Sequence, residues 1–221
     1  MSLTVKICGL REPAAIDQAV QAGANYLGFI FYPPSARALR PDEAAGLMAE
    51  IPDDVGKVGV FVDPSDSEIE TVLALCPLDV IQLHGHETPE RVAEVALRSG
   101  LRVMKAIQVE TADDLGALSA HVAAADMILF DAKPPRDGTT VPGGNGLSFD
   151  WRVLQGLTID KPWFLAGGLD AENLARAVDL VAPPGVDVSS GVERWPGAKD
   201  PVKLRAFLME ARRLASLPKA S

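Results

Sequence analysis

Short apolar runs alternate with amphipathic helical segments along the chain, and this alternation constrains the fold more than any other feature of the sequence. The first run, Leu3 to Cys8, precedes a helical pattern from Pro13 to Ala22, and Gly23 suits the residue after that helix. Eight such pairs fit into 221 residues, at roughly 27 residues each. Strands that alternate with helices form parallel sheets, because each helix returns the chain to the same end of the sheet.

The expected strands cover residues 3–8, 26–31, 57–62, 79–83, 102–107, 127–130, 163–166 and 186–188. The expected helices cover residues 13–22, 41–50, 66–75, 89–98, 112–123, 149–155, 171–181 and 201–214. Eight units in one domain close most economically into a (β/α)8 TIM barrel with eight parallel strands. An open doubly wound sheet is the rival fold, but no strand is followed by a G-x-G-x-x-G turn. We therefore predict a single-domain barrel over residues 1–215 and a flexible tail at 216–221.

Composition and charge exclude several classes of function. The chain is 48% hydrophobic, but no apolar run approaches the roughly 20 residues that span a bilayer, and the N-terminus lacks a secretion-signal pattern. A net charge of −9 disfavours nucleic-acid binding, although local cations and backbone N–H groups can still hold one small anionic substrate. The two cysteines lack zinc-like spacing, which predicts neither a disulfide framework nor a metal site and fits a cytoplasmic protein.

The barrel prediction changes the interpretation of Cys8, which by itself would be read as a small core residue. Active sites in this fold lie at the carboxyl ends of the strands, where alternate residues point into the barrel. In the first strand Leu3, Val5 and Ile7 share the outward parity. Cys8 therefore points inward at the mouth of the barrel, and Gly9 leaves space above it.

Other strand ends carry polar residues where a plain core would have Val or Leu. Gln82 and His84 share the inward parity of the fourth strand, and Asp131 ends the sixth. Each alone could be a capping or solvated loop residue, but together they indicate a site. Lower in the barrel, a buried unpaired charge would be costly, and the eighth strand closes against the first. We therefore predict an ion pair between Lys6 and Asp187, with a structural role.

Two glycine-rich turns indicate an anion site. The seventh strand runs into Gly167 and Gly168, and the eighth into Ser189, Ser190 and Gly191. In many barrels these two loops bind phosphate through backbone N–H groups. A long loop at 134–146 is either an active-site cover or a surface insertion.

Arg37, in the loop after the second strand, is the remaining candidate for binding an anion. Its guanidinium could hold a carboxylate, although an isolated loop arginine is more often a solvated residue.

Taken together, these segments resemble the phosphoribosylanthranilate isomerase family over essentially the whole chain. The resemblance rests on VKICGL at 5–10, GFIFYPPSAR at 28–37, VGVFV at 58–62, IQLHG at 81–85, LFDAK at 129–133, SFDW at 148–151, LAGGL at 165–169 and VDVSSGVE at 186–193. The order and spacing of KICG, QLHG and DVSSGVE are highly specific. The proline-rich start of the loop at 134–146, and Ala166 before the glycine pair, depart from the pattern in local geometry only.

The resemblance implies a cofactor-free Amadori rearrangement in tryptophan biosynthesis, by a cytoplasmic monomer or homodimer. By analogy, Asp131 is the general acid, Cys8 is the general base, and Arg37 holds the carboxylate of the substrate. Gly167, Gly168, Ser189, Ser190 and Gly191 would bind its phosphate. Gln82 and His84 would line the site, and His84 could alternatively tune Cys8.

Two alternatives stay open from the residues alone. One is another phosphosugar barrel enzyme, although a synthase of indole-glycerol phosphate would need more catalytic Lys and Glu. A ribulose-phosphate epimerase would need metal-binding residues at several strand ends, and only one strand here ends in histidine. The other alternative is a barrel that binds a ligand without catalysing a reaction.

Overall fold

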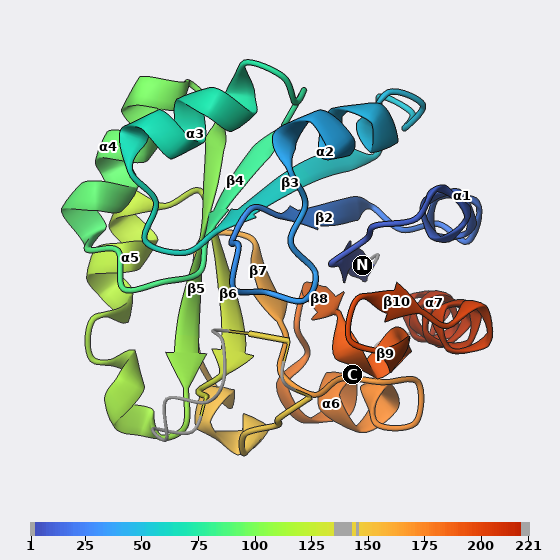
Figure 1. The fold of residues 1–221 in the computed structure, drawn as a ribbon. Coiled ribbons are helices and arrows are strands. Elements are labelled where there is room, and N and C mark those ends of the chain that lie inside the picture. The colour runs from blue at the N-terminus through green and yellow to red at the C-terminus, as the bar shows by residue number, and fades with distance from the viewer. Residues whose placement is uncertain (1–2, 135–142, 145, 218–221) are drawn as a thin grey trace.

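The structure is a computed structural model that describes residues 3–134, 143–144 and 146–217. Eight parallel strands close into a barrel in the order of the sequence, and β1 pairs with both β2 and β8. Figure 1 shows the helices packed outside these strands. The strands are β1 (Thr4–Cys8), β2 (Tyr26–Ile30), β3 (Gly56–Phe61), β4 (Val80–Leu83), β5 (Arg102–Val109), β6 (Met127–Ala132), β7 (Trp163–Leu165) and β8 (Gly185–Val188). The predicted (β/α)8 fold is confirmed.

The helices close the outside of the barrel, and α7 lies beside α1 where the chain returns to its start (Figure 1). Proline at the first helical turn begins several of them, as in α1, α2, α4 and α7. The α-helices are α1 (Pro13–Gln21), α2 (Pro41–Met48), α3 (Asp66–Leu73), α4 (Pro89–Ser99), α5 (Leu118–Ala124), α6 (Leu174–Val181) and α7 (Pro201–Ser216). The described residues also form short 3-10 helices, η1 (Ala112–Leu115), η2 (Trp151–Leu154) and η3 (Ser190–Val192).

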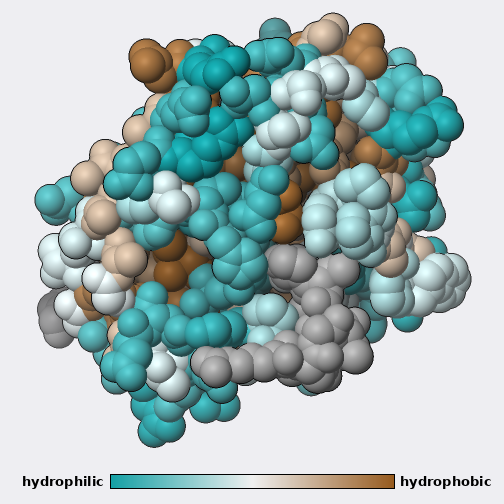
Figure 2. Space-filling view, turned by 60° about the vertical axis from the view of Figure 1, so that its left-hand side comes forward, coloured by the Kyte–Doolittle hydropathy of each residue, from teal (hydrophilic) through white to brown (hydrophobic). Residues whose placement is uncertain are grey.

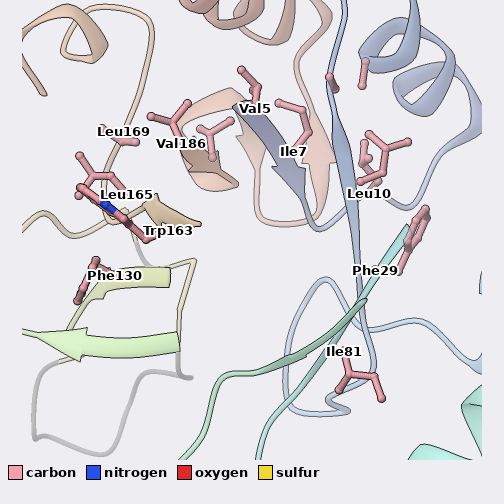
Figure 3. Packing of buried hydrophobic residues seen from close by; sticks show 14 of the residues in the cluster. Val5, Ile7, Leu10, Phe29, Ile81, Phe130, Trp163, Leu165, Leu169 and Val186 are labelled. Carbon is pink, nitrogen blue, oxygen red and sulfur yellow. The ribbon is translucent and has the colours of Figure 1, made fainter. Parts of the chain in front are cut away.

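Strand parity separates two apolar layers. Val5, Ile7 and Val186, labelled in Figure 3, belong to the larger cluster between the strands and the helices. A smaller cluster includes residues of the opposite parity, and these fill the barrel itself: Cys8, Val58, Val60, Val80, Met104, Ala106, Met127, Leu129, Phe164 and Ala166. Cys8 is thus an inward residue at the end of β1, as the alternation predicts.

Several elements differ from the sequence prediction. The helix expected at 112–123 is split into η1 and α5, with Gly116 between them. The helix expected from residue 171 begins at Leu174, after a turn in which the Asp170 carboxylate accepts hydrogen bonds from the backbone N–H groups of residues 172 and 173. A short antiparallel hairpin of β9 (Glu193–Trp195) and β10 (Ala198–Lys199) follows η3 and was not expected.

At the C-terminus, α7 continues to Ser216, which the prediction assigned to the tail, and residues 218–221 lie outside the described residues. Most of the expected loop at 134–146 also lies outside them. Figure 2 shows hydrophilic residues over most of one face, with hydrophobic side chains visible in hollows between them. Within the described ranges, each helix is too short or too polar to cross a bilayer.

Candidate active site

One cavity opens at the carboxyl ends of the strands, with a volume of about 750 Å³ that includes its open mouth. Side chains that bear chemistry reach it from β1, β6, β8 and the loops after β2 and β4: Cys8, Arg37, His84, Asp131 and Asp187. Residues that the sequence scatters over the chain thus lie around a single space.

The predicted ion pair lies beneath Cys8. The Lys6 ammonium donates to Asp187 Oδ1 at 2.9 Å, and the register places these two residues side by side on β1 and β8. The Lys6 side chain is fully buried. Burial disfavours its charged form, but the charges and hydrogen bonds of Asp187 and Cys8 together outweigh this effect, so the pKa of Lys6 is raised.

Cys8 lies in a packed and charged environment. A Cβ on Gly28 would lie 2.9 Å from Cys8 Sγ and 3.3 Å from Lys6 Cε, so a glycine is needed where β2 passes this pair. Burial raises the pKa of the Cys8 thiol, and the Asp187 carboxylate adds to this effect. The positive charges of Lys6 and Lys199 oppose it without cancelling it. At neutral pH Cys8 is therefore mainly a thiol.

Asp131 lies at the end of β6 in a network of uncharged donors. Its Oδ1 accepts from the Ala132 backbone N–H at 2.9 Å, and its Oδ2 lies 3.1 Å from His84 Nε2. His84 Nδ1 in turn lies 2.8 Å from the Gln82 amide nitrogen. His84 lines the cavity, whereas Gln82 is fully buried and lies one layer below the wall on which we expected it.

Arg37 also lines the cavity, but it is not free. Its Nε and Nη2 form a two-pronged contact with the Glu193 carboxylate, at 2.9 and 2.7 Å. Lys199 Nζ donates to the same carboxylate at 2.8 Å and to the Ser189 carbonyl at 3.1 Å. Arg37 Nη2 donates in addition to the carbonyl oxygen of Gly144 at 3.0 Å. The charge network therefore ties the loop after β2 to the hairpin that follows β8.

The expected phosphate turns meet at one side of the cavity. Gly167, Gly168, Ser189 and Ser190 line it, and both glycines have positive φ, at +83° and +69°. Gly191 does not line the cavity. A Cβ on it would lie 1.9 Å from the Leu169 carbonyl oxygen, so it lets the two loops pack together.

Sequence reasoning missed two residues of this site. Glu193 ends the VDVSSGVE segment that carried the resemblance, but the sequence pattern does not indicate that it pairs with Arg37. Lys199 lies on the unexpected hairpin, and its pKa is lowered by burial despite Glu193. Another buried cation, Lys105, pairs with Glu87 at 2.7 Å between β5 and the loop after β4. Lys6 and Lys105 thus each have a carboxylate partner, as the cost of burying an unpaired charge requires.

Comparison with known proteins identifies the family. Residues 5–210 match the family model described as N-(5'phosphoribosyl)anthranilate (PRA) isomerase. The chain belongs to this isomerase family. The match confirms the resemblance inferred from the sequence, together with the expected isomerase function in tryptophan biosynthesis.

Relatives in the isomerase family match the chain over nearly its whole length. An N-(5'-phosphoribosyl)anthranilate isomerase from Paracoccus denitrificans is 57% identical over 96% of this chain and 98% of the relative. One from Paramagnetospirillum magneticum is 52% identical over 96% and 98%. The crystal structure of the Thermotoga maritima isomerase superposes with a TM-score of 0.84 at 35% identity, covering 96% of this chain and 99% of that one.

A further isomerase structure was solved with reduced 1-(o-carboxyphenylamino)-1-deoxyribulose 5-phosphate. It superposes with a TM-score of 0.80 at 33% identity, over 96% of this chain and 99% of that one. The barrel fold and the family are thus shown by independent comparisons, whereas the role of each side chain rests on the geometry above.

Proposed function

We propose that this chain converts N-(5'-phosphoribosyl)anthranilate into 1-(2-carboxyphenylamino)-1-deoxyribulose 5-phosphate, with Asp131 as the general acid and Cys8 as the general base. The observation that carries these assignments is that both side chains line one cavity, at the carboxyl ends of β1 and β6. This is the end of a (β/α)8 barrel where catalytic groups lie.

In the first step, Asp131 gives a proton to the ring oxygen of the substrate. The bond between C1' and that oxygen breaks, and the nitrogen lone pair forms the C1'=N double bond of an iminium cation. Asp131 becomes a carboxylate, which the Ala132 N–H and His84 then stabilise by hydrogen bonding.

Before the second step the Cys8 thiol loses its proton to water in the open cavity, and the resulting thiolate removes the proton at C2'. The electrons of that C–H bond form the C1'=C2' double bond and neutralise the iminium nitrogen, and the resulting enolamine tautomerises to the ketone. Because burial raises the pKa of Cys8, the order of the steps matters. The iminium cation formed by the first step adds a positive charge that favours the thiolate.

The two ends of the substrate are held at different sides of the cavity. We assign the phosphate to the turns of Gly167, Gly168, Ser189 and Ser190, whose backbone lines the cavity. We assign the carboxylate to Arg37. Glu193 holds one edge of its guanidinium, and the Gly144 carbonyl takes the place on Nη2 that a carboxylate oxygen of the substrate would occupy.

The test is loss of the fluorescence of phosphoribosylanthranilate when purified protein is added in buffer with a metal chelator. We expect turnover without any added metal or cofactor. Folded protein, judged by circular dichroism, that gives no turnover would contradict the proposal. Binding of the product without turnover would favour the alternative of a non-catalytic ligand-binding barrel.

Two features of the biological setting follow as proposals. The two cysteines are unpaired, which suits the reducing cytoplasm, the compartment we assign to the reaction. The chain acts as a monomer or a homodimer. Among related structures is one of monomers generated from the dimeric isomerase of Thermotoga maritima. Sedimentation at micromolar concentration would distinguish the two states.

A further inference from the structure

A line of hydrogen-bonding side chains runs from the interior of the barrel to the acid of the proposed reaction. Gln82 and His84 both point inward from the region of β4, two residues apart. The Gln82 amide nitrogen lies 2.8 Å from His84 Nδ1, and His84 Nε2 lies 3.1 Å from Asp131 Oδ2. Gln82 is fully buried, and His84 and Asp131 are each only 7% exposed.

The chemistry of these atoms determines which of them donates and which accepts in each hydrogen bond. An amide nitrogen can only donate, so His84 Nδ1 must accept, and the single proton of a neutral imidazole then lies on Nε2. That Nε2–H donates to Asp131 Oδ2, while the Ala132 backbone N–H donates to Oδ1. Each carboxyl oxygen of Asp131 thus receives one hydrogen bond from a fixed protein group.

A second observation concerns the oxygen of the same Gln82 amide group. Its Oε1 is buried and has no hydrogen-bond partner among the described residues. A buried polar atom without a partner is destabilising, and an apolar side chain of similar size would avoid it. The presence of an amide at this position is explained if its N–H group has a task, and the atom that it faces is His84 Nδ1.

We propose that Gln82 and His84 are positioning residues for Asp131: Gln82 holds His84 as the Nε2–H tautomer, and His84 orients the carboxyl group and stabilises the carboxylate left after proton donation. This inference rests on the proposed function, because it assigns a purpose to the charge that develops on Asp131. Neither residue gives a proton to the substrate. Their effect is on the barrier of the first step rather than on substrate binding.

Kinetics of two matched variants test the role of His84. A hydrogen bond to a charged group is strong enough for its loss to lower kcat about 10- to 100-fold, which we expect for His84→Leu, with KM changed by less than about threefold. His84→Gln keeps an amide N–H near the position of Nε2, and we expect it to retain kcat within about fivefold. His86→Leu is the control, because the His86 side chain is 83% exposed and pairs with Asp63.

The tautomer can be measured directly in the wild-type protein, so the test does not depend on a variant that folds. The chain has only three histidines, and ¹⁵N-histidine NMR resolves protonated from unprotonated ring nitrogens. We expect His84, assigned by the loss of its signals in His84→Leu, to show a protonated Nε2 and an unprotonated Nδ1. In Gln82→Met we expect a mixture of both tautomers and a fall in kcat with little change in KM.

The outcomes separate this inference from the proposed function. Wild-type protein without turnover defeats the proposed function, whatever the tautomer of His84. Wild-type protein that turns over substrate, with a His84→Leu variant within twofold of its kcat, overturns the inference alone. A protonated Nδ1 with an unprotonated Nε2 in the active wild type also overturns it, as does a His84→Gln variant as slow as His84→Leu.

Discussion

The side chains beneath the two proposed catalytic groups differ in charge. Beneath Cys8, on the side of β1 and β8, the interior is charged: Lys6 pairs with Asp187, and Lys199 acts on the thiol from the hairpin side. Beneath Asp131, on the side of β4 and β6, the support is built from the uncharged amide of Gln82 and the imidazole of His84. One barrel thus supplies two different electrostatic settings.

The difference matches what each group has to do. A buried thiol ionises only with difficulty, so a base of this type needs positive charge nearby. An acid has to carry its proton before the step and lose it during the step, so a permanent cation beside Asp131 would hold it ionised throughout. A neutral hydrogen-bond donor supports the carboxylate when it forms and is weaker than a full charge.

The largest expected effect is on the free energy of unfolding, which should differ between variants of the charged residues beneath Cys8 and of the uncharged residues beneath Asp131. Asp187→Asn leaves the fully buried Lys6 ammonium without its counter-ion, and breaking a buried pair in this way costs about 3–5 kcal/mol. Gln82→Met removes one neutral hydrogen bond and also the unpartnered oxygen, so we expect a loss of about 1 kcal/mol or less. Urea unfolding of both variants measures the difference.

A double variant is the control for that comparison. Lys6→Met combined with Asp187→Leu removes both charges, and we expect it to recover most of the stability that Asp187→Asn loses. Equal losses in Asp187→Asn and Gln82→Met would show that the charged and uncharged supports do not differ in the way described.

The second prediction concerns the catalytic groups themselves. Cys8→Ala removes the base and Asp131→Asn removes the acid while keeping its shape, and each is expected to lower turnover at least about 100-fold, the usual scale for acid–base groups. Steady-state fluorescence assays measure it. Cys76→Ala, at the other free cysteine, is the matched control and should leave turnover unchanged. Near-normal turnover in either active-site variant would remove its assigned role.

The smallest expected effect concerns how the charge of Lys199 affects the ionisation of Cys8. Because burial raises the pKa of Cys8 above its ordinary value of 9.0, alkylation of the free protein by iodoacetamide should be slow at pH 7 and accelerate as the pH rises beyond 9.0. Lys199→Met removes one of the charges that favour the thiolate, so alkylation at a fixed pH should slow by about threefold. The rates are compared in a Cys76→Ala background, and an unchanged or faster rate would contradict the role of Lys199.

Part of the site follows from alternation alone. Parity along a parallel strand places Cys8, His84 and Asp131 at the mouth of the barrel, and the closure of β8 on β1 pairs Lys6 with Asp187. These predictions succeed because strand geometry repeats every two residues and does not depend on side-chain conformers. The prediction that Gln82 lines the cavity was wrong, because parity gives the direction in which a side chain points but not its height along the barrel axis.

Other features depend on contacts that the sequence pattern does not encode. Arg37 and Glu193 are 156 residues apart, and their pairing requires the loop after β2 to meet the hairpin after η3. The hairpin itself was missed because β9 and β10 have only three and two residues, too few for a periodic signal. The pairing of Lys105 with Glu87 likewise depends on how the loop after β4 folds against β5.

The sequence by itself determined the barrel, the family and the inward direction of the two proposed catalytic side chains, because apolar periodicity and strand parity are local properties of the chain. Only the tertiary structure decided the ionic setting of those side chains. Burial and the approach of Lys6, Lys199 and Asp187 set the state of Cys8, and the line from Gln82 through His84 orients Asp131. Electrostatic energies depend on distance and burial, and both arise from packing between segments far apart in the chain.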